Sequence, residues 1–365
     1  MTNWVLYRKY RPQTFTEMTG QEIIVKTIQN AIAKNRQAHG YLFCGPRGVG
    51  KTTLARLMAK AINCENRKTG QSEPCNQCAS CQSIMAARAL DLVEIDAASN
   101  RGIDEIRDLK EGIRFSPSQL KYKVFIIDEV HMLTREAFNA LLKTLEEPPA
   151  HAIFILATTE AHKVPETIIS RCQRFDFARL PLEKIIERLA HIAQQEKIKI
   201  DKQALEMIAL NSTGGMRDAE SLLGQIMAVQ DKEITGPEVR EILGAVDDLK
   251  IKDFMDILIA DDESRALDFI NQLLEEGHNL HQFIKAAINY LRKVLILGVD
   301  EKLQKVAAVE LTAKQAEIIV AQSRKLGETK TLRLIGLLIE AGTQTKNAPI
   351  IQLPLELAVL KFLQK

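Results

Sequence analysis

The segment Gly45-Pro46-Arg47-Gly48-Val49-Gly50-Lys51-Thr52 has the residue types and spacing of a phosphate-binding loop, G-x-x-x-x-G-K-[ST]. Backbone N–H groups of a glycine-rich turn can surround a phosphate, and the N-terminus of the following helix, here Lys51 to Thr53, favours negative charge. Lys51 is then expected to reach the β- and γ-phosphates of a nucleoside triphosphate, and the Thr52 hydroxyl to bind Mg²⁺. The alternative is a chance glycine turn, but a predicted strand precedes this segment and a predicted helix follows it.

A pair of carboxylates supplies the second half of such a site. Asp128 and Glu129 directly follow the apolar run Val124-Phe125-Ile126-Ile127, and a carboxylate at the carboxyl end of a buried strand can contact Mg²⁺. Glu129, one residue further on, could polarise an attacking water molecule. The same pair could lie in a solvated turn, but beside a phosphate-binding loop it predicts hydrolysis of a nucleoside triphosphate.

Four cysteines are crowded into one short stretch, with the spacing Cys64-x10-Cys75-x2-Cys78-x2-Cys81. Thiolates separated by two residues can close on one tetrahedral ion, and four of them leave no coordination position open. The alternative is four free buried thiols, although the residues between them are mostly polar. The spacing therefore predicts a structural zinc site rather than a catalytic one.

Four further polar positions are candidates with open alternatives. Thr158 and Thr159 follow the next predicted strand, so a hydroxyl could project beside the γ-phosphate or the attacking water. A helix N-cap or a turn is the alternative for these threonines. Arg171 and Arg217 could neutralise charge in the transition state, or they could be solvated surface arginines.

Short β-rich runs alternate with helical patterns from about residue 38 to residue 178. The runs are residues 40–43, 92–95, 124–127 and 153–156, with a weaker one at 174–177. Such alternation predicts an α/β domain over residues 1–178, in which helices cover both faces of a parallel sheet. After residue 179 the strand signal disappears and apolar residues keep a helical spacing. We therefore expect a small helical domain at residues 179–243 and an all-α assembly or packing domain at 244–365.

Composition narrows the class of protein. Hydrophobic residues make up 46% and charged residues 26% of the 365 residues, which excludes a disordered or collagen-like chain. The net charge of +2 is too small to give the chain an overall positive electrostatic field that attracts nucleic acid. Any contact with DNA must therefore come from local geometry. The longest apolar stretch, residues 152–157, is too short to cross a bilayer, and no apolar signal segment follows the first residues. We expect a cytoplasmic protein with no membrane partner.

In this order, the motifs resemble those of AAA+ ATPases, and more narrowly those of clamp loaders. Tyr10-Arg11-Pro12 with Phe15, followed by Gly20-Gln21-Glu22, is similar to the amino-terminal box that lies against the nucleotide. Asp128-Glu129-Val130-His131-Met132 is similar to the Walker B motif. Ser170-Arg171-Cys172 is similar to the arginine-finger motif, and Gly215-Met216-Arg217-Asp218-Ala219 is similar to sensor 2. The four-cysteine insertion narrows the resemblance to the tau/gamma family of bacterial DNA polymerase III.

The resemblance implies roles that residue spacing cannot supply. Tyr10 and Arg11 would lie against bound ATP, and the second of the two threonines, Thr159, would occupy the sensor 1 position. Arg217 would act from the lid on ATP in its own subunit. Arg171 would act in trans, on ATP held by the neighbouring subunit.

The resemblance also implies partners and a reaction. Residues 244–365 would form a collar that holds a pentameric ring, made of further copies of this subunit with delta and delta-prime. Binding of ATP with Mg²⁺ would let the ring open the beta sliding clamp and place it on primed DNA, and hydrolysis would release the clamp. The implied activity is an ATPase within the DNA polymerase III holoenzyme, a nucleotidyltransferase complex with DNA-directed DNA polymerase activity. Zn²⁺ would be held by the module at residues 64–81.

One segment of the same family pattern concerns DNA. Residues 99–107 resemble the clamp-loader segment whose helix N-terminus faces the central chamber, where Arg101 could meet DNA phosphates. A solvated helix start with acidic neighbours is the alternative.

Three other functions fit these motifs less well. A branch-migration or helicase motor of the AAA+ class would not explain the cysteine insertion or the collar-like third region. A non-hydrolysing scaffold subunit should have a degraded phosphate-binding loop, whereas Lys51 and Thr52 are both present. A purely structural zinc protein would have no need of Asp128, Glu129 or Arg171.

Overall fold

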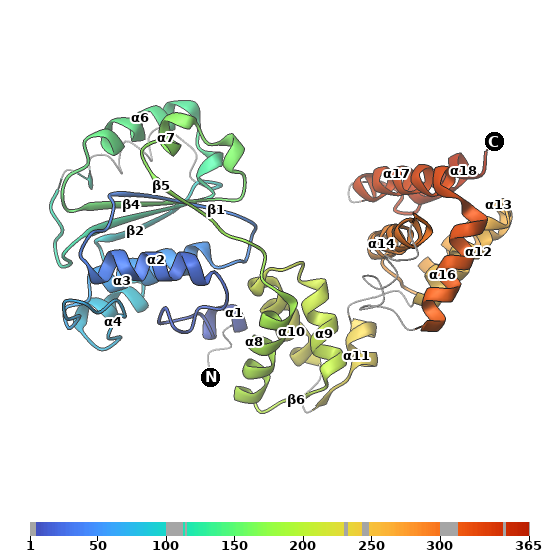
Figure 1. Ribbon diagram of the computed structural model, residues 1–365, viewed down its shortest axis with the longest axis horizontal. Helices are drawn as coiled ribbons and strands as arrows, with labels where there is room; N and C mark the ends of the chain where they lie inside the picture. The colour runs from blue at the N-terminus through green and yellow to red at the C-terminus, as the bar shows by residue number, and fades with distance from the viewer. Residues whose placement is uncertain are drawn as a thin grey trace. The chain divides into compact units, whose positions relative to one another are not determined.

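The computed structural model describes residues 5–99, 112–113, 115–229, 233–242, 248–299, 313–345 and 348–364. The chain forms two compact units, Met1–Gly236 and Pro237–Lys365 (Figure 1). Arg101 and most of the segment predicted to meet DNA lie outside the described residues. Among the described residues, no helix combines the length and apolar character needed to cross a membrane.

A five-stranded sheet with parallel neighbours forms the centre of the first unit. Its strands are β1 (Gly40–Cys44), β2 (Leu92–Asp96), β3 (Lys123–Asp128), β4 (Ala152–Thr158) and β5 (Gln173–Asp176), in the order β2-β3-β4-β1-β5. In the register, Cys44 pairs with Thr158 and Asp96 with Asp128. Because parallel strands end at the same edge, this order brings the glycine-rich loop after β1 and the polar residues after β3 and β4 to one edge of the sheet.

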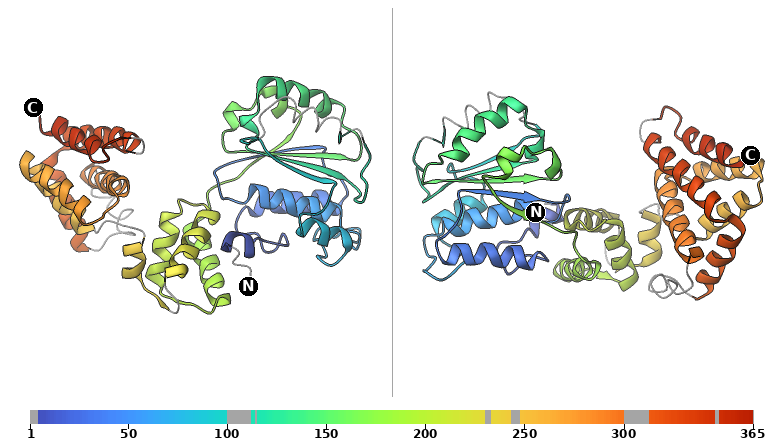
Figure 2. Two further views of the ribbon diagram at one scale, coloured as in Figure 1. Left: turned by 180° about the vertical axis from the view of Figure 1, so that it is seen from behind. Right: turned by 45° about the horizontal axis from the view of Figure 1, so that its top comes forward.

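Helices cover both faces of this sheet (Figure 1 and Figure 2). They are α2 (Glu22–Ala33) and α3 (Lys51–Ile62) on one face, and α6 (Arg135–Glu146) and α7 (Glu166–Ile169) on the other. On the first face Leu54 packs with Phe43; on the second Leu141 packs with Phe125 and Phe154, whose rings stack 5.2 Å apart. Strands β1 and β4 are buried along their whole length, which is why their sequences are continuous apolar runs. The predicted α/β architecture is confirmed.

The remaining parts of the first unit flank this core. They are α1 (Leu6–Lys9), α4 (Ala79–Met85), two short 3₁₀ helices (Val130–Met132 and Ala161–Lys163), and a helical lid of α8 (Leu182–Gln195), α9 (Lys202–Asn211) and α10 (Met216–Val229). The lid also contains a parallel pair of two-residue strands, β6 (Lys199–Ile200) and β7 (Glu233–Ile234). The expectation that strands end after residue 179 is therefore wrong in this detail, because two residues are too few to produce a periodic pattern.

Local sequence signals place the starts of several helices. The Asp201 side chain accepts a hydrogen bond from the N–H of Ala204 at the start of α9, and the Thr134 side chain does the same for Ala137 in α6. These caps satisfy N–H groups that have no partner inside the helix. Pro181 directly precedes α8, a position where its missing N–H costs nothing.

The described elements within the second unit are helical, as their apolar spacing predicts. They are α12 (Asp248–Ile259), α13 (Glu263–Glu275), α14 (Leu280–Val299), α16 (Ala313–Leu326), α17 (Glu328–Gln344) and α18 (Leu353–Leu363), and α11 (Gly236–Ile242) spans the boundary between the units. The Phe254 ring lies 5.1 Å from that of Phe283 and 5.5 Å from that of Phe269. These rings belong to one core cluster that joins α12, α13, α14, α17 and α18.

Candidate nucleotide site and metal centre

The glycine-rich loop connects β1 to α3 and is shaped by close backbone approaches. Gly50 caps α3 with φ at +105°, in the left-handed region that side chains other than glycine rarely adopt. A Cβ at Gly45 would lie 2.5 Å from the carbonyl oxygen of Phe177, so any larger residue would push the loop away from Phe177, which directly follows β5. The two glycines therefore hold the loop in a fixed turn above the first strand.

Lys51 is folded into this loop. Its side chain is buried, and Nζ donates to the carbonyl oxygens of Gly45 at 2.7 Å and Pro46 at 2.8 Å. Burial lowers the pKa of Lys51, and the carboxylates of Glu129 and Asp128 oppose this effect. The ammonium group is thus held at the loop, where a bound phosphate would need it.

A direct hydrogen bond joins the two motifs. The Thr52 hydroxyl donates to Oδ2 of Asp128 at 2.7 Å, and Oδ1 of Asp128 accepts the N–H of Glu129 at 2.9 Å. A hydroxyl and a carboxylate at this separation offer the oxygen ligands that Mg²⁺ prefers. The donor set therefore fits a magnesium ion bound with a nucleotide.

The two threonines at the end of β4 contact different partners. Oγ1 of Thr158 lies 3.0 Å from Nδ1 of His131, and Thr158 is fully buried. The Thr159 hydroxyl instead donates to Oε2 of Glu129. Both residues therefore contact the segment after β3, and Thr159 is the one that reaches Glu129.

A cavity of about 380 Å³ lies over the loop. Its walls come from four parts of the first unit. These are residues near the N-terminus (Tyr7, Arg11, Pro12, Met18 and Thr19), the loop and α3 (residues 47–53), the ends of β2 and β3 (Asp96, Ala98, Asp128 and Glu129), and the lid with the stretch that leads to it (Leu180, Arg188, Met216, Arg217 and Glu220). This volume is within the range of small-molecule sites. Arg47, Gly48, Val49, Thr52, Thr53 and Arg217, all predicted to bind the nucleotide, are thus brought to one cavity.

The lid touches the loop through Arg217. Its backbone N–H donates to the carbonyl oxygen of Gly48 at 3.4 Å. Its guanidinium lies 4.6 Å from the centre of the Tyr7 ring and lowers the pKa of the Tyr7 hydroxyl. A cation from the lid and the phosphate-binding loop therefore share one wall of the cavity.

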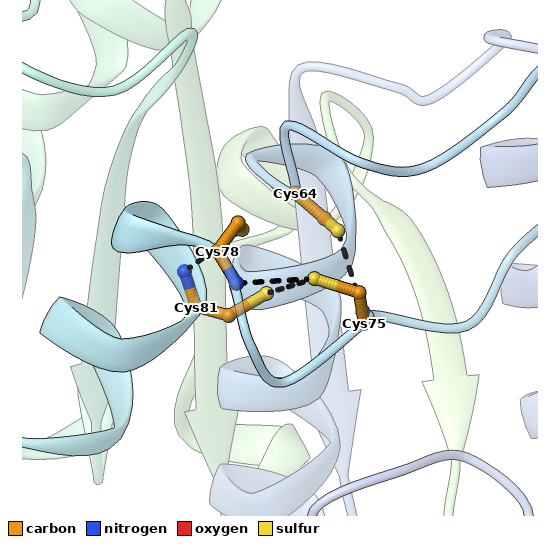
Figure 3. Close-up of side chains that lie close together, drawn as sticks. All are labelled: Cys64, Cys75, Cys78 and Cys81. Atoms are coloured by element: carbon orange, nitrogen blue, oxygen red, sulfur yellow. Dashed lines mark hydrogen bonds between the residues drawn. The ribbon is translucent and has the colours of Figure 1, made fainter.

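The four clustered cysteines form a second centre beside the end of α3. Their Sγ atoms all lie within 4.8 Å of one another, and those of Cys75 and Cys81 are 4.0 Å apart. Tetrahedral zinc–sulfur bonds of about 2.3 Å would place neighbouring sulfur atoms about 3.8 Å apart. Figure 3 shows the side chains of Cys64, Cys75 and Cys81 directed toward one another. The geometry fits a closed four-sulfur metal site.

Backbone N–H groups in this cluster favour the thiolate form of Cys75. Sγ of Cys75 accepts from Gln77 at 3.4 Å and from Cys78 at 3.3 Å, and the N–H of Gln77 is the largest cause that lowers the pKa of Cys75 to about 6. Burial raises the pKa of the Cys81 thiol. A divalent cation would favour the thiolate form of all four.

Comparison with known proteins places the chain in a family. Residues 20–181 match the family profile described as DNA polymerase III, delta subunit. Residues 184–232 match the profile of the DNA polymerase III clamp loader subunit, ATPase lid domain, and residues 234–365 match that of DNA polymerase III subunits gamma and tau domain III. The chain is 35% identical over 365 residues to DNA polymerase III subunit gamma of Buchnera aphidicola subsp. Acyrthosiphon pisum (strain APS), covering 100% of this chain and 99% of that one. This chain belongs to the gamma/tau family of DNA polymerase III.

Longer relatives in the gamma/tau family are also similar. DNA polymerase III subunit tau of Bacillus subtilis (strain 168) is 47% identical over 327 residues, which cover 88% of this chain and 58% of the relative. The tau subunit of Escherichia coli (strain K12) is 39% identical over 317 residues, covering 86% of this chain and 49% of the relative. The chain thus spans about half the length of these tau subunits.

Five residues predicted for the nucleotide site of this gamma/tau chain do not line the cavity. Tyr10 lies outside its wall, because its hydroxyl donates to Glu196 of the lid at 2.7 Å, whereas Tyr7 lies in the wall. Thr159 reaches the cavity only through Glu129. Arg171 is held by Glu146 of α6. Gly45 and Pro46 contribute the carbonyl groups that hold Lys51.

Arg171 follows α7 and is held on the α6 side of the sheet. Its guanidinium donates to Oε1 of Glu146 at 2.7 Å, to the carbonyl oxygen of Thr167 at 2.7 Å and to the hydroxyl of Ser170 at 3.2 Å. About a third of the side chain remains exposed. Arg171 is therefore ordered by its own subunit but does not contribute to its own subunit's nucleotide cavity.

Sequence reasoning missed a buried ion pair in the cavity wall. Nε of Arg188 lies 3.5 Å from Oε1 of Glu220, and both side chains are largely buried. Burial raises the pKa of Glu220 to about 7, and Arg188 opposes this. Each charge borders the apolar face of its helix, because Arg188 lies three residues after Ile185 and Glu220 three residues before Leu223. A charged residue within an apolar stripe was the signal that could have revealed them.

Proposed function

We propose that this chain is the ATP-hydrolysing motor subunit of the bacterial clamp loader. In this proposal ATP binding lets a pentameric ring open the beta sliding clamp and place it on primed DNA, and hydrolysis releases the clamp. The proposed parts are an ATPase domain at residues 1–178, a lid at 179–243 and a collar at 244–365. Its place in the DNA polymerase III holoenzyme makes a cytoplasmic location part of the proposal.

The observation that carries this proposal is the hydrogen bond between Thr52 and Asp128 at 2.7 Å. It brings the phosphate-binding loop and the strand-end carboxylate into the geometry of one Mg²⁺–nucleotide site. Lys51 and Glu129 both line the same cavity. A bound nucleoside triphosphate would place its γ-phosphate between the Lys51 ammonium group and Glu129, the proposed general base.

The residues divide the work of hydrolysis. Lys51 and the loop N–H groups would bind the β- and γ-phosphates, and Thr52 and Asp128 would hold Mg²⁺, whose charge would offset that of the phosphoryl group. Glu129, oriented by Thr159, accepts a proton from the attacking water. Arg217 contributes positive charge from the lid.

Arg171 is proposed to act between subunits. Its side chain lies outside its own cavity and is partly exposed, which supports a role toward the nucleotide of a neighbouring copy. A cation that arrives only at the subunit boundary would make hydrolysis depend on assembly. The proposed neighbours are further copies of this chain together with delta and delta-prime, joined through the collar.

Zn²⁺ is the metal proposed for the four-cysteine module. Four thiolates leave no open coordination position, so the ion would be structural. The module would therefore stabilise residues 64–81 and take no part in phosphoryl transfer.

The test is ATP hydrolysis by the reconstituted complex with delta and delta-prime. We expect the rate to rise when beta clamp and primed DNA are both added, and Lys51→Ala to abolish ATP binding while the ring still assembles. A rate that responds to Holliday-junction DNA but not to clamp would instead favour a branch-migration motor. Absence of hydrolysis in a correctly assembled wild-type complex would favour a scaffold subunit.

A further inference from the structure

Glu73, in the loop between Cys64 and Cys75, contacts residues outside the four-cysteine module. Its carboxylate accepts four hydrogen bonds: from the N–H of Phe15 at 2.8 Å, the N–H of Thr16 at 3.0 Å, the hydroxyl of Thr16 at 2.9 Å and Nε2 of Gln29 at 3.2 Å. Hydrogen bonds to a charged acceptor are stronger than neutral ones. Glu73 lies only two residues before Cys75. A metal-bound Cys75 would fix the position of this carboxylate.

The segment that Glu73 holds leads directly to the nucleotide cavity. Phe15 is buried in the core beside α3, and its carbonyl oxygen accepts the N–H of Met18 at 3.1 Å. Met18 lines the cavity, and its terminal methyl group would lie 3.0 Å from a Cβ at Gly50. A continuous set of contacts therefore runs from the metal module through Phe15 and Met18 to the phosphate-binding loop.

A second anchor holds the same segment from α3. Nζ of Lys60 donates to the carbonyl oxygen of Gln13 at 2.7 Å and to its Oε1 at 2.9 Å. Lys60 is only 2% exposed. Residues 11–19, here called the N-terminal segment, are thus fixed at two points, one on the helix that carries Lys51 and one on the metal module.

We propose that Glu73 is a positioning residue for ATP binding, through which the four-cysteine module holds the N-terminal segment against the nucleotide. The inference rests on the proposed function. Arg11, Pro12, Met18 and Thr19 of this segment form one side of the cavity. Without the Glu73 anchor, the part of the segment that Glu73 holds must be ordered again each time a nucleotide binds. That loss of conformational freedom weakens nucleotide binding. The module thereby acquires a role in nucleotide affinity although it lies outside the site.

The test measures ATP affinity in the full chain by titrating a fluorescent ATP analogue. We expect Glu73→Ala to raise the Kd about tenfold, within the range typical of coupling between two sites. Glu73→Gln should give an intermediate Kd, because its single amide oxygen can replace only one of the two carboxylate oxygens that accept the N–H groups of Phe15 and Thr16. Zinc content, measured by elemental analysis, should be that of the wild type in both variants.

Glu65→Ala is the matched control. Glu65 lies in the same module, but its carboxylate accepts from the N–H and the hydroxyl of Ser80, inside the module. We expect its ATP affinity to equal that of the wild type. An equal rise in Kd for Glu65→Ala and Glu73→Ala would overturn the specific role of Glu73.

Steady-state kinetics in the assembled complex separates positioning from general damage. A lost positioning contact should raise the KM for ATP and leave kcat unchanged. A lower kcat at unchanged KM would indicate less folded enzyme and would overturn the inference, as would loss of zinc from Glu73→Ala. If the wild-type chain fails to bind the analogue, the proposed function fails together with the inference. If the wild type binds and Glu73→Ala binds equally well, only the inference fails.

Discussion

The Thr159 hydroxyl donates a hydrogen bond of 2.9 Å to Oε2 of Glu129, and the Thr159 N–H lies 3.3 Å from the same oxygen. Nδ1 of His131 is 3.4 Å from this oxygen as well. Glu129 has φ at +47°, so its backbone turns sharply at the end of β3. Thr159, directly after β4, therefore orients the carboxylate of Glu129, the proposed general base.

Removing the Thr159 hydroxyl should slow hydrolysis without weakening ATP binding. Loss of a general base costs about 10²–10⁴-fold in rate, so Glu129→Gln should lie in that range. Thr159→Val should be slower than the wild type but faster than Glu129→Gln, whereas Thr159→Ser keeps the hydroxyl and should remain close to the wild type. Single-turnover hydrolysis and ATP titrations would measure both quantities. The double variant should be no slower than Glu129→Gln, since both changes affect one group; full additivity would contradict this coupling.

Arg171 should matter only between subunits. A cation supplied in trans can contribute about 10³–10⁵ in rate, so Arg171→Ala should bind ATP but fail to activate a neighbour. Rings that mix Arg171→Ala with Lys51→Ala subunits should recover part of the ATPase activity, because some interfaces pair an intact loop with an intact arginine. No recovery in rings proven to have exchanged subunits would refute the trans role.

The control for this experiment is Arg174→Ala. Arg174 is three residues further on and forms an exposed ion pair with Asp176 at 2.8 Å. Exposed pairs of this kind contribute about 0–1 kcal/mol, so the variant should hydrolyse ATP at close to the wild-type rate. Equal losses in both arginine variants would indicate a general charge effect.

The cysteine cluster should hold one zinc ion per chain. Elemental analysis of freshly purified protein checks this directly, and Cys75→Ser should lose the ion because one of the four sulfur ligands is removed. Cys172→Ser is the control, since Cys172 lies outside the cluster. Wild-type protein purified without any metal would contradict the prediction.

Stability should depend on pH through Glu220. Burial raises its pKa to about 7 in the folded chain, against about 4.3 for an exposed glutamate. Between these values the unfolded chain binds fewer protons than the folded chain, so stability falls as pH rises, and the loss is complete above pH 7. At 1.36 kcal/mol per pKa unit, the full loss of stability is about 4 kcal/mol.

Glu220→Gln removes this titration, so its stability relative to the wild type should rise by about 2–3 kcal/mol between pH 5 and pH 7.5. Thermal unfolding at the two pH values measures the change. Glu183→Gln, an exposed position on α8, should show no such dependence. A difference between wild type and Glu220→Gln that does not vary with pH would show that Glu220 is ionised at both values.

Local sequence patterns predicted the strands, the main helices and the cysteine cluster. This succeeded because each of these signals lies within a few residues: continuous apolar runs for β1 and β4, apolar residues at helical spacing for α8, and two-residue gaps between Cys75, Cys78 and Cys81. The short pair β6–β7 escaped prediction because each strand has two residues, too few to show a period.

The sequence alone determined which residue types could bind phosphate, magnesium and zinc, since these depend on side-chain chemistry and close spacing. Only the tertiary structure decided which distant residues meet. The strand order β2-β3-β4-β1-β5 brings Thr52 to Asp128 and Thr159 to Glu129. Folding of the lid places Arg188 and Glu220 in the cavity wall. A hydrogen bond to Glu196 of the lid holds the Tyr10 side chain outside that wall. No local pattern contains these contacts, because each joins segments separated by 30 or more residues and forms only when the complete sheet and lid are packed.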